Sequence, residues 1–75
     1  MTPHDVLDTK GLLCPLPVLK ARKRLMALAS GQLLVLIADD PAAQIDVPHF
    51  CNEQGHRLIS AEPIAGAWRF TIAKG

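Results

Sequence analysis

The sequence has few aromatic residues, few cysteines and no excess of charge of either sign. It contains no tyrosine, two phenylalanines and one tryptophan, and its formal net charge is +1. Proteins that bind long nucleic acids through their net charge need a larger positive charge, and proteins that stack bases on aromatic rings need more aromatic residues. Its two cysteines, Cys14 and Cys51, form neither a secreted disulfide framework nor a zinc-site spacing. We therefore expect free thiols, no metal and no cofactor.

Long apolar segments are also missing. No run approaches the roughly 18 apolar residues of a membrane-spanning helix. The first five residues do not begin a basic region followed by an apolar stretch, as a signal peptide would. These absences predict a soluble, cytoplasmic protein with no membrane contact. Apolar residues nevertheless make up 49% of the 75 residues, which predicts one domain over residues 1–75 with its own small core and with residues 1–4 frayed.

The spacing of apolar residues predicts six elements. In chain order they are a strand over 5–10, a helix over 15–29, a strand over 33–38, a helix over 46–54, and strands over 56–62 and 67–73. The run over 33–38 is apolar throughout, which indicates a central strand. The second helix is expected to begin near Asp46, because a proline such as Pro48 is tolerated in a first turn. The order predicts an α/β (α+β) two-layer sandwich, β-α-β-α-β-β, with both helices on one face of a mixed four-stranded sheet.

One turn, residues 11–17, places a thiol where a strand gives way to a helix. Pro15 and Pro17 lack an N–H group and fit only in a first turn, so the helix must begin next to Cys14. We expect Cys14 to cap the helix, or else Leu16, because a residue before proline avoids the helical conformation. In either register the sulfur lies at the positive end of the helix, which predicts a lowered thiol pKa and a nucleophilic thiolate.

Other roles for Cys14 follow from the same residues. The competing interpretations of Cys14 are a small buried core residue, half of a redox dithiol and a metal ligand. The sequence has no Cys-x-x-Cys pair to support the dithiol and no neighbouring ligand to support a metal site. Cys51 shares a helical face with Val47 and Phe50, so packing accounts for it. A catalytic cysteine–histidine pair would draw on one of three histidines, all expected at the surface: His4, His49 and His56.

A basic stretch follows the thiol by one to two helical turns. It consists of Lys20, Arg22, Lys23 and Arg24, which we call the basic face. Such a run is most often a solvated helix surface, but here it lies where it would guide an acidic partner or a phosphate backbone toward the sulfur. The basic face and Leu13 are therefore our candidates for partner docking.

These residues resemble the TusA/SirA-like small sulfur carriers, whose mark is a Cys-Pro-x-Pro turn that opens the first helix. Residues 14–17 supply that turn, and the resemblance extends over most of the chain in four blocks: residues 7–18, 22–23, 37–42 and 46–51. The resemblance implies a two-layer fold and a cysteine that accepts sulfane sulfur as a persulfide and passes it on. By position that cysteine is Cys14, held by a turn made of Gly11, Pro15, Leu16 and Pro17.

The resemblance also implies partners. The donor is expected to be a cysteine desulfurase or a rhodanese-like protein. The acceptor belongs to a relay for tRNA 2-thiouridine formation, to sulfur oxidation or to cofactor biosynthesis. Contact with tRNA is expected to be indirect, and the protein to be a monomer that acts stoichiometrically rather than as a stand-alone enzyme. Leu13 and Leu16 depart from the polar or charged residues common in tRNA-pathway members, which leaves the pathway open.

Two other functions remain as alternatives. The order of elements also resembles the C-terminal domain of the third translation initiation factor, which would make the chain a small RNA-binding module. The few aromatic residues and the near-neutral charge count against that reading. A thiol-based redox or regulatory protein is the other alternative, and it predicts a disulfide between Cys14 and Cys51 under mild oxidation.

Overall fold

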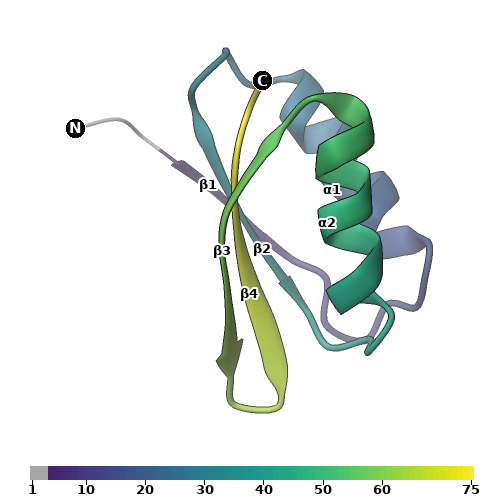
Figure 1. The fold of residues 1–75 in the computed structure, drawn as a ribbon. Coiled ribbons are helices and arrows are strands. Elements are labelled where there is room, and N and C mark those ends of the chain that lie inside the picture. The colour runs from purple at the N-terminus through teal and green to yellow at the C-terminus, as the bar shows by residue number, and fades with distance from the viewer. Residues whose placement is uncertain (1–3) are drawn as a thin grey trace.

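Two α-helices lie on one face of a four-stranded sheet in the computed structural model, which describes residues 4–75 (Figure 1). The elements are β1 (His4–Asp8), α1 (Leu16–Met26), β2 (Leu33–Ala38), α2 (Ala43–Gln54), β3 (Arg57–Ile64) and β4 (Ala67–Ala73). Their order and types confirm the predicted α+β two-layer sandwich. The expected fraying of residues 1–4 is wrong for His4, which begins β1, and residues 1–3 lie outside the described part.

The strands are arranged in the order β1-β2-β4-β3. β1 runs parallel to β2, and β4 pairs antiparallel with both β2 and β3, so the sheet is mixed as predicted. β2 therefore has a neighbour on each side, which confirms the central strand predicted over 33–38. Leu34, Leu36 and Ala38 of β2 are buried, whereas the residues between them are only half-buried.

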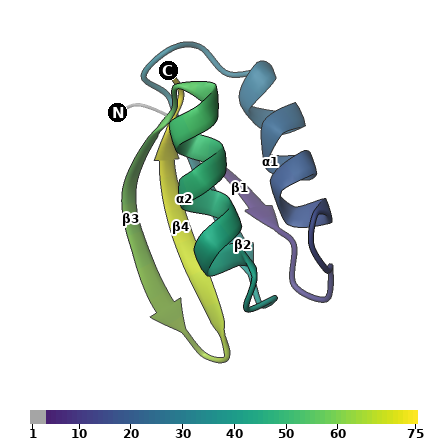
Figure 2. The same ribbon diagram turned by 45° about the vertical axis from the view of Figure 1, so that its right-hand side comes forward.

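The core lies between the sheet and the helices (Figure 2). Its buried residues are Ala21 and Leu25 of α1, Ala43, Val47, Phe50 and Cys51 of α2, Leu34, Leu36 and Ala38 of β2, and Phe70 and Ile72 of β4. Burial of Cys51 confirms that this residue packs. In β4, Phe70 and Ile72 are buried and alternate with more exposed neighbours, so one face of this strand packs on the core.

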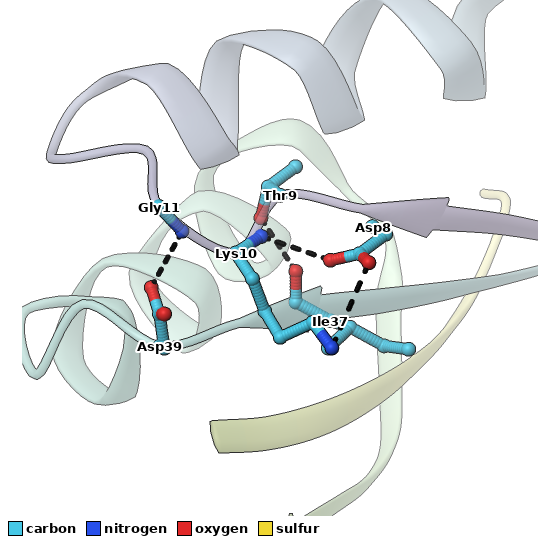
Figure 3. A network of polar contacts seen from close by, with 6 residues as sticks. All are labelled: Asp8, Thr9, Lys10, Gly11, Ile37 and Asp39. Atoms are coloured by element: carbon cyan, nitrogen blue, oxygen red, sulfur yellow. Dashed lines mark hydrogen bonds and ion pairs between the residues drawn. The ribbon is translucent and has the colours of Figure 1, made fainter. Parts of the chain in front are cut away.

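A buried threonine fixes the chain where β1 ends. Thr9 is fully buried, and both its amide N–H and its hydroxyl donate to the carbonyl of Ile37, at 2.7 and 2.6 Å (Figure 3). A buried hydroxyl needs such a partner, because an unsatisfied polar group in the core is costly. The connection from β1 to α1 is thus attached to the end of β2.

The first helix ends earlier than predicted, at Met26 rather than Ala29. Lys74, which follows β4, donates from Nζ to the carbonyls of Leu25 and Leu28, at 2.7 and 3.1 Å. The lysine thus supplies hydrogen-bond donors to carbonyls at the end of the helix, which would accept N–H groups of following residues if the helix continued. Gly31 has a left-handed conformation (φ 89°), but it lies in the connection to β2 and not at the end of the helix.

The second helix begins three residues earlier than predicted, at Ala43 instead of Asp46. The turn after β2 leads directly into α2, because the N–H groups of Ala43 and Asp46 donate to the carbonyls of Asp40 and Ala42. Pro48 therefore lies inside the helix. Because it has no N–H, it leaves the carbonyl of Gln44, an exposed residue, without its usual hydrogen-bond donor in the helix. The predicted end is confirmed, since Gly55 closes α2 with a left-handed φ of 74°.

The closing hairpin differs from the prediction only in β3. β4 has the predicted bounds, but β3 begins at Arg57 rather than His56 and continues to Ile64, through a proline that we had placed in the loop. β3 is an edge strand, paired only with β4. Pro63 is tolerated there because an edge strand has N–H groups that need no ladder partner.

Candidate functional site

Cys14 lies on the connection between β1 and α1, and its side chain is exposed. Neither predicted helix register is correct, because α1 is capped by Pro15 and begins at Leu16. The N–H of Leu16 donates to the carbonyl of Leu13 at 2.9 Å, and the turn thus closed contains Cys14 and Pro15. Cys14 is therefore the residue before the cap. Pro17 is the second residue of the helix and is buried, as a proline in a first turn can be.

Two adjacent carboxylates hold this turn from the neighbouring strand. The N–H of Cys14 donates to Asp40 Oδ2 at 2.6 Å. The N–H of Gly11 donates to Asp39 Oδ1 at 3.0 Å, as Figure 3 shows. Gly11 has a φ of 85°, a left-handed conformation that glycine adopts without a steric penalty. Both acids follow β2 directly, and β2 is parallel to β1, so the ends of the two strands meet at one edge of the sheet. The turn is fixed by side chains that the sequence analysis did not include in the site.

A third carboxylate contacts the sulfur itself. Cys14 Sγ donates a hydrogen bond to Asp46 Oδ2 at 2.7 Å, and Asp46 lies in the first turn of α2. The hydrogen bond to Asp46 raises the pKa of the Cys14 thiol above its ordinary value. Partial desolvation and the negative charges of Asp46 and Asp40 add to the increase.

The predicted lowering of the Cys14 pKa is therefore wrong. The prediction counted the dipole of α1 and the basic residues of the same helix, whereas the group in contact with the sulfur is an acid from another helix. A full negative charge at hydrogen-bond distance outweighs the partial charge of a helix end. Among the described residues, no basic side chain pairs with Asp46. The contact with Asp46 therefore favours the thiol form of Cys14 over the thiolate.

A shallow hollow of about 230 Å³ opens beside the thiol, between the start of α1 and α2. Its lining comprises Cys14, Pro15, Val18, Asp46, His49, Phe50 and Glu53. Pro15, Val18 and Phe50 are its apolar lining residues, and the acidic side chains of its lining come from α2. The sequence predicted Cys14 and Pro15 for the site and named His49 among the histidines available to pair with Cys14. It missed Asp46 and Glu53, which lie 32 and 39 residues further along the chain than Cys14.

Neither His49 nor His56 forms a catalytic pair with Cys14, and the side chain of His4 lies outside the described part of the structure. His49 is exposed, as predicted, but its Nε2 pairs with Glu53, one turn further along α2. His56 is half-buried rather than fully at the surface, and its Nδ1 accepts the N–H of Gly75 at 3.0 Å. Burial and the charge of Lys74 lower the pKa of His56. The thiol proton is directed to Asp46 and not to an imidazole.

The predicted docking residues lie on both sides of the turn. Leu13 and Leu16 are exposed, at 70% and 44% of their surface, and flank Cys14 with apolar side chains. Lys20, Arg22 and Lys23 are exposed along α1. Arg24 differs from the other members of the basic face, because its Nη1 donates to both carboxylate oxygens of Asp5 at 2.7 Å. That ion pair connects α1 to β1.

Among residues 4–75 no three histidine, cysteine or acidic side chains are grouped as a metal site would require. In the same part of the chain, neither helix has the length and apolar character needed to cross a bilayer.

Comparisons with known proteins concern the whole chain and not this site alone. The family model described as Sulfurtransferase TusA matches residues 5–74. A curated relative, the sulfur carrier protein TusA of Pseudomonas putida (strain GB-1), is 44% identical over 73 residues, which cover 97% of this chain and 91% of the relative. The crystal structure of a SirA-like protein from Desulfitobacterium hafniense superposes with a TM-score of 0.81 at 25% identity, over 93% of this chain and 96% of that one.

Proposed function

This chain belongs to the TusA family of sulfur carriers, and from that premise we propose that Cys14 is the residue on which sulfur is carried. One contrast supports the assignment: Cys14 is exposed on a turn held by two carboxylates, whereas Cys51 is 3% exposed within the core. A carrier thiol must reach the sulfur of another protein, and a buried thiol cannot. Gly11, Pro15, Leu16 and Pro17 serve to position this turn.

The proposed reaction is a thiol exchange in two steps. Cys14 sulfur attacks the outer sulfur of a persulfide on the donor, and the bond between the two donor sulfurs breaks. Cys14 then carries the outer sulfur as a persulfide, and the proton lost by its thiol is recovered by the donor cysteine. A thiol of the acceptor attacks the carried sulfur in the same way and leaves Cys14 as a thiol. The exchange has no net oxidation, so neither step needs a cofactor.

The surface around Cys14 supports protein partners on both sides of the exchange. Exposed Leu13 and Leu16 offer apolar contact beside the sulfur, and Lys20, Arg22 and Lys23 offer positive charge along α1. We propose that a cysteine desulfurase or a rhodanese-like protein donates the sulfur at this surface and that an acceptor protein receives it there. Formation of tRNA 2-thiouridine, sulfur oxidation and cofactor biosynthesis are the candidate pathways, with any tRNA contact being indirect.

The test is the mass of the protein after exposure to a sulfur donor. Incubation with a cysteine desulfurase and cysteine is expected to add the mass of one sulfur atom, removable by a thiol reductant. Cys14→Ser is expected to lose this gain, and Cys51→Ser, the matched control, to keep it. Loading of Cys14→Ser to the wild-type level would refute the assignment of the carrier residue.

A further inference from the structure

Asp46 differs from every other carboxylate of the chain in what it contacts. All seven Asp and Glu side chains lie in the described residues, and their partners fall into three groups. Four pair with a basic side chain, namely Asp5, Asp8, Glu53 and Glu62. Asp39 and Asp40 accept backbone N–H groups. Within residues 4–75, the one contact of Asp46 is the thiol proton of Cys14. Asp46 is thus an acid that has no basic partner in this part of the chain and contacts the proposed carrier sulfur.

The other charged groups around the sulfur are also mainly acidic. Asp40 approaches from the connection between β2 and α2, where it binds the N–H of Cys14. Glu53 lines the hollow from α2, together with the His49 that it pairs with. Val18 of α1 and its cap residue Pro15 line this hollow, whereas Lys20 and Lys23 line a separate one next to β1. A molecule that reaches Cys14 through the hollow therefore meets negative charge.

Two backbone N–H groups of the turn that carries the sulfur are already in use. They belong to Gly11 and Cys14, in the connection that precedes α1. Here they donate to Asp39 and Asp40. A small anionic sulfur compound would have to displace a carboxylate of the protein before it could use either group.

We propose, building on the carrier function above, that Asp46 is a specificity-determining residue, which favours sulfur donors with a positive charge beside the sulfur to be transferred and disfavours anionic donors such as thiosulfate. A lysine or arginine next to the donor's persulfide is the partner chemistry that fits. That cation pairs with the Asp46 carboxylate, weakens its hydrogen bond to Sγ and lets the thiol lose its proton. An anion at the same place is repelled by Asp46 and Asp40, and Cys14 stays protonated.

Charged methanethiosulfonate reagents test this selectivity directly. An ethylammonium, a methyl and an ethylsulfonate reagent carry positive, zero and negative charge, and each transfers its thio group to a thiolate with release of a sulfinate. The rate of modification of Cys14 is measured for each reagent at neutral pH, with the modified residue located by peptide mass. The ratio of cationic to anionic rates is divided by the same ratio for free 2-mercaptoethanol, to remove the intrinsic reactivity of the reagents.

The normalised ratio is expected to fall about tenfold in Asp46→Asn, because a unit charge at about 4 Å in water changes each rate by roughly fivefold and salt screens part of the effect. Asp46→Glu, which keeps the charge, is expected to restore most of the ratio. Glu62→Gln, which removes a carboxylate paired with Arg69 on the distant hairpin, is expected to leave it unchanged.

An Asp46→Asn protein with the wild-type ratio would overturn the proposal, as would an equal fall in Glu62→Gln, which would show that only net charge matters. If Asp46→Asn does not fold, the wild-type protein decides alone. Its ratio must exceed one and decrease as salt is added, and a ratio at or below one, or a ratio independent of salt, would overturn the proposal. The reagents do not depend on sulfur carriage, so failure of Cys14 to load with sulfur would refute the carrier function separately.

Discussion

The contact between Lys74 and the end of α1 leads to a prediction about stability. Lys74 Nζ donates to the carbonyls of Leu25 and Leu28, and Lys74→Met removes both hydrogen bonds while keeping a side chain of similar length. A hydrogen bond from a charged group contributes about 1.5–3 kcal/mol, and a cation at a helix C-terminus a further 0.3–1 kcal/mol or so. The Leu25 carbonyl also accepts the N–H of Leu28, and Lys74 is partly exposed, so both contributions are reduced.

We therefore expect Lys74→Met to lower the free energy of unfolding by about 2 kcal/mol, which for a domain of this size lowers the melting temperature by roughly 8–16 °C. Urea unfolding followed by the fluorescence of Trp68, the single tryptophan, measures the change. The matched control is Lys20→Met, which removes an exposed lysine of α1 that has no hydrogen bond in the described structure. A loss within about 0.5 kcal/mol of that control would refute the reasoning, since it would mean that the Lys74 contacts contribute no more than a surface charge.

Two further predictions concern buried polar groups. Burial raises the pKa of Cys51 from an ordinary 9.0 to about 11, so the unfolded thiol loses its proton first as pH rises. The free energy of unfolding therefore falls as pH rises between these two values, and the fall is expected to be on the order of 1–2 kcal/mol larger in the wild type than in Cys51→Ala. Urea unfolding from pH 8 to 11 measures the free energy of unfolding of both proteins, and an equal dependence on pH in the two would contradict this prediction. Thr9→Val keeps the shape of a buried side chain but removes its hydrogen bond to Ile37, so chemical denaturation should show a loss of about 1 kcal/mol; unchanged or increased stability would argue against a role for that bond.

Much of the sheet was predictable because its strands have strong local patterns. β2 is apolar throughout and β4 alternates, and both have the predicted bounds. The helix boundaries were less predictable, because contacts from elsewhere in the chain decide them. Lys74 ends α1 from a position about fifty residues away, and the turn after β2 begins α2 ahead of a proline that we took as the sign of its start.

Of the candidate site, only the turn over residues 14–17 was predictable from the sequence. The Cys-Pro-x-Pro turn identified Cys14 and the family, because both depend on neighbouring residues. Asp39, Asp40 and Asp46 reach that turn only because β1 and β2 are parallel and because α2 packs beside α1. The sign of the Cys14 pKa shift was wrong for the same reason. Local reasoning counted a helix end and basic neighbours, and the decisive charge comes from the second helix.

The positions of the two ends of α1 also indicate where the protein can be immobilised for binding experiments. The N-terminal end of α1 adjoins Cys14, and its C-terminal end is bound by Lys74, the residue before Gly75. Eleven helical residues separate these ends by about 16 Å, and the C-terminus lies far from the connection between β1 and α1 (Figure 2). A linker attached after Gly75 can therefore anchor the protein to a sensor surface with the Cys14 turn facing the solution, where the proposed donor and acceptor can reach it.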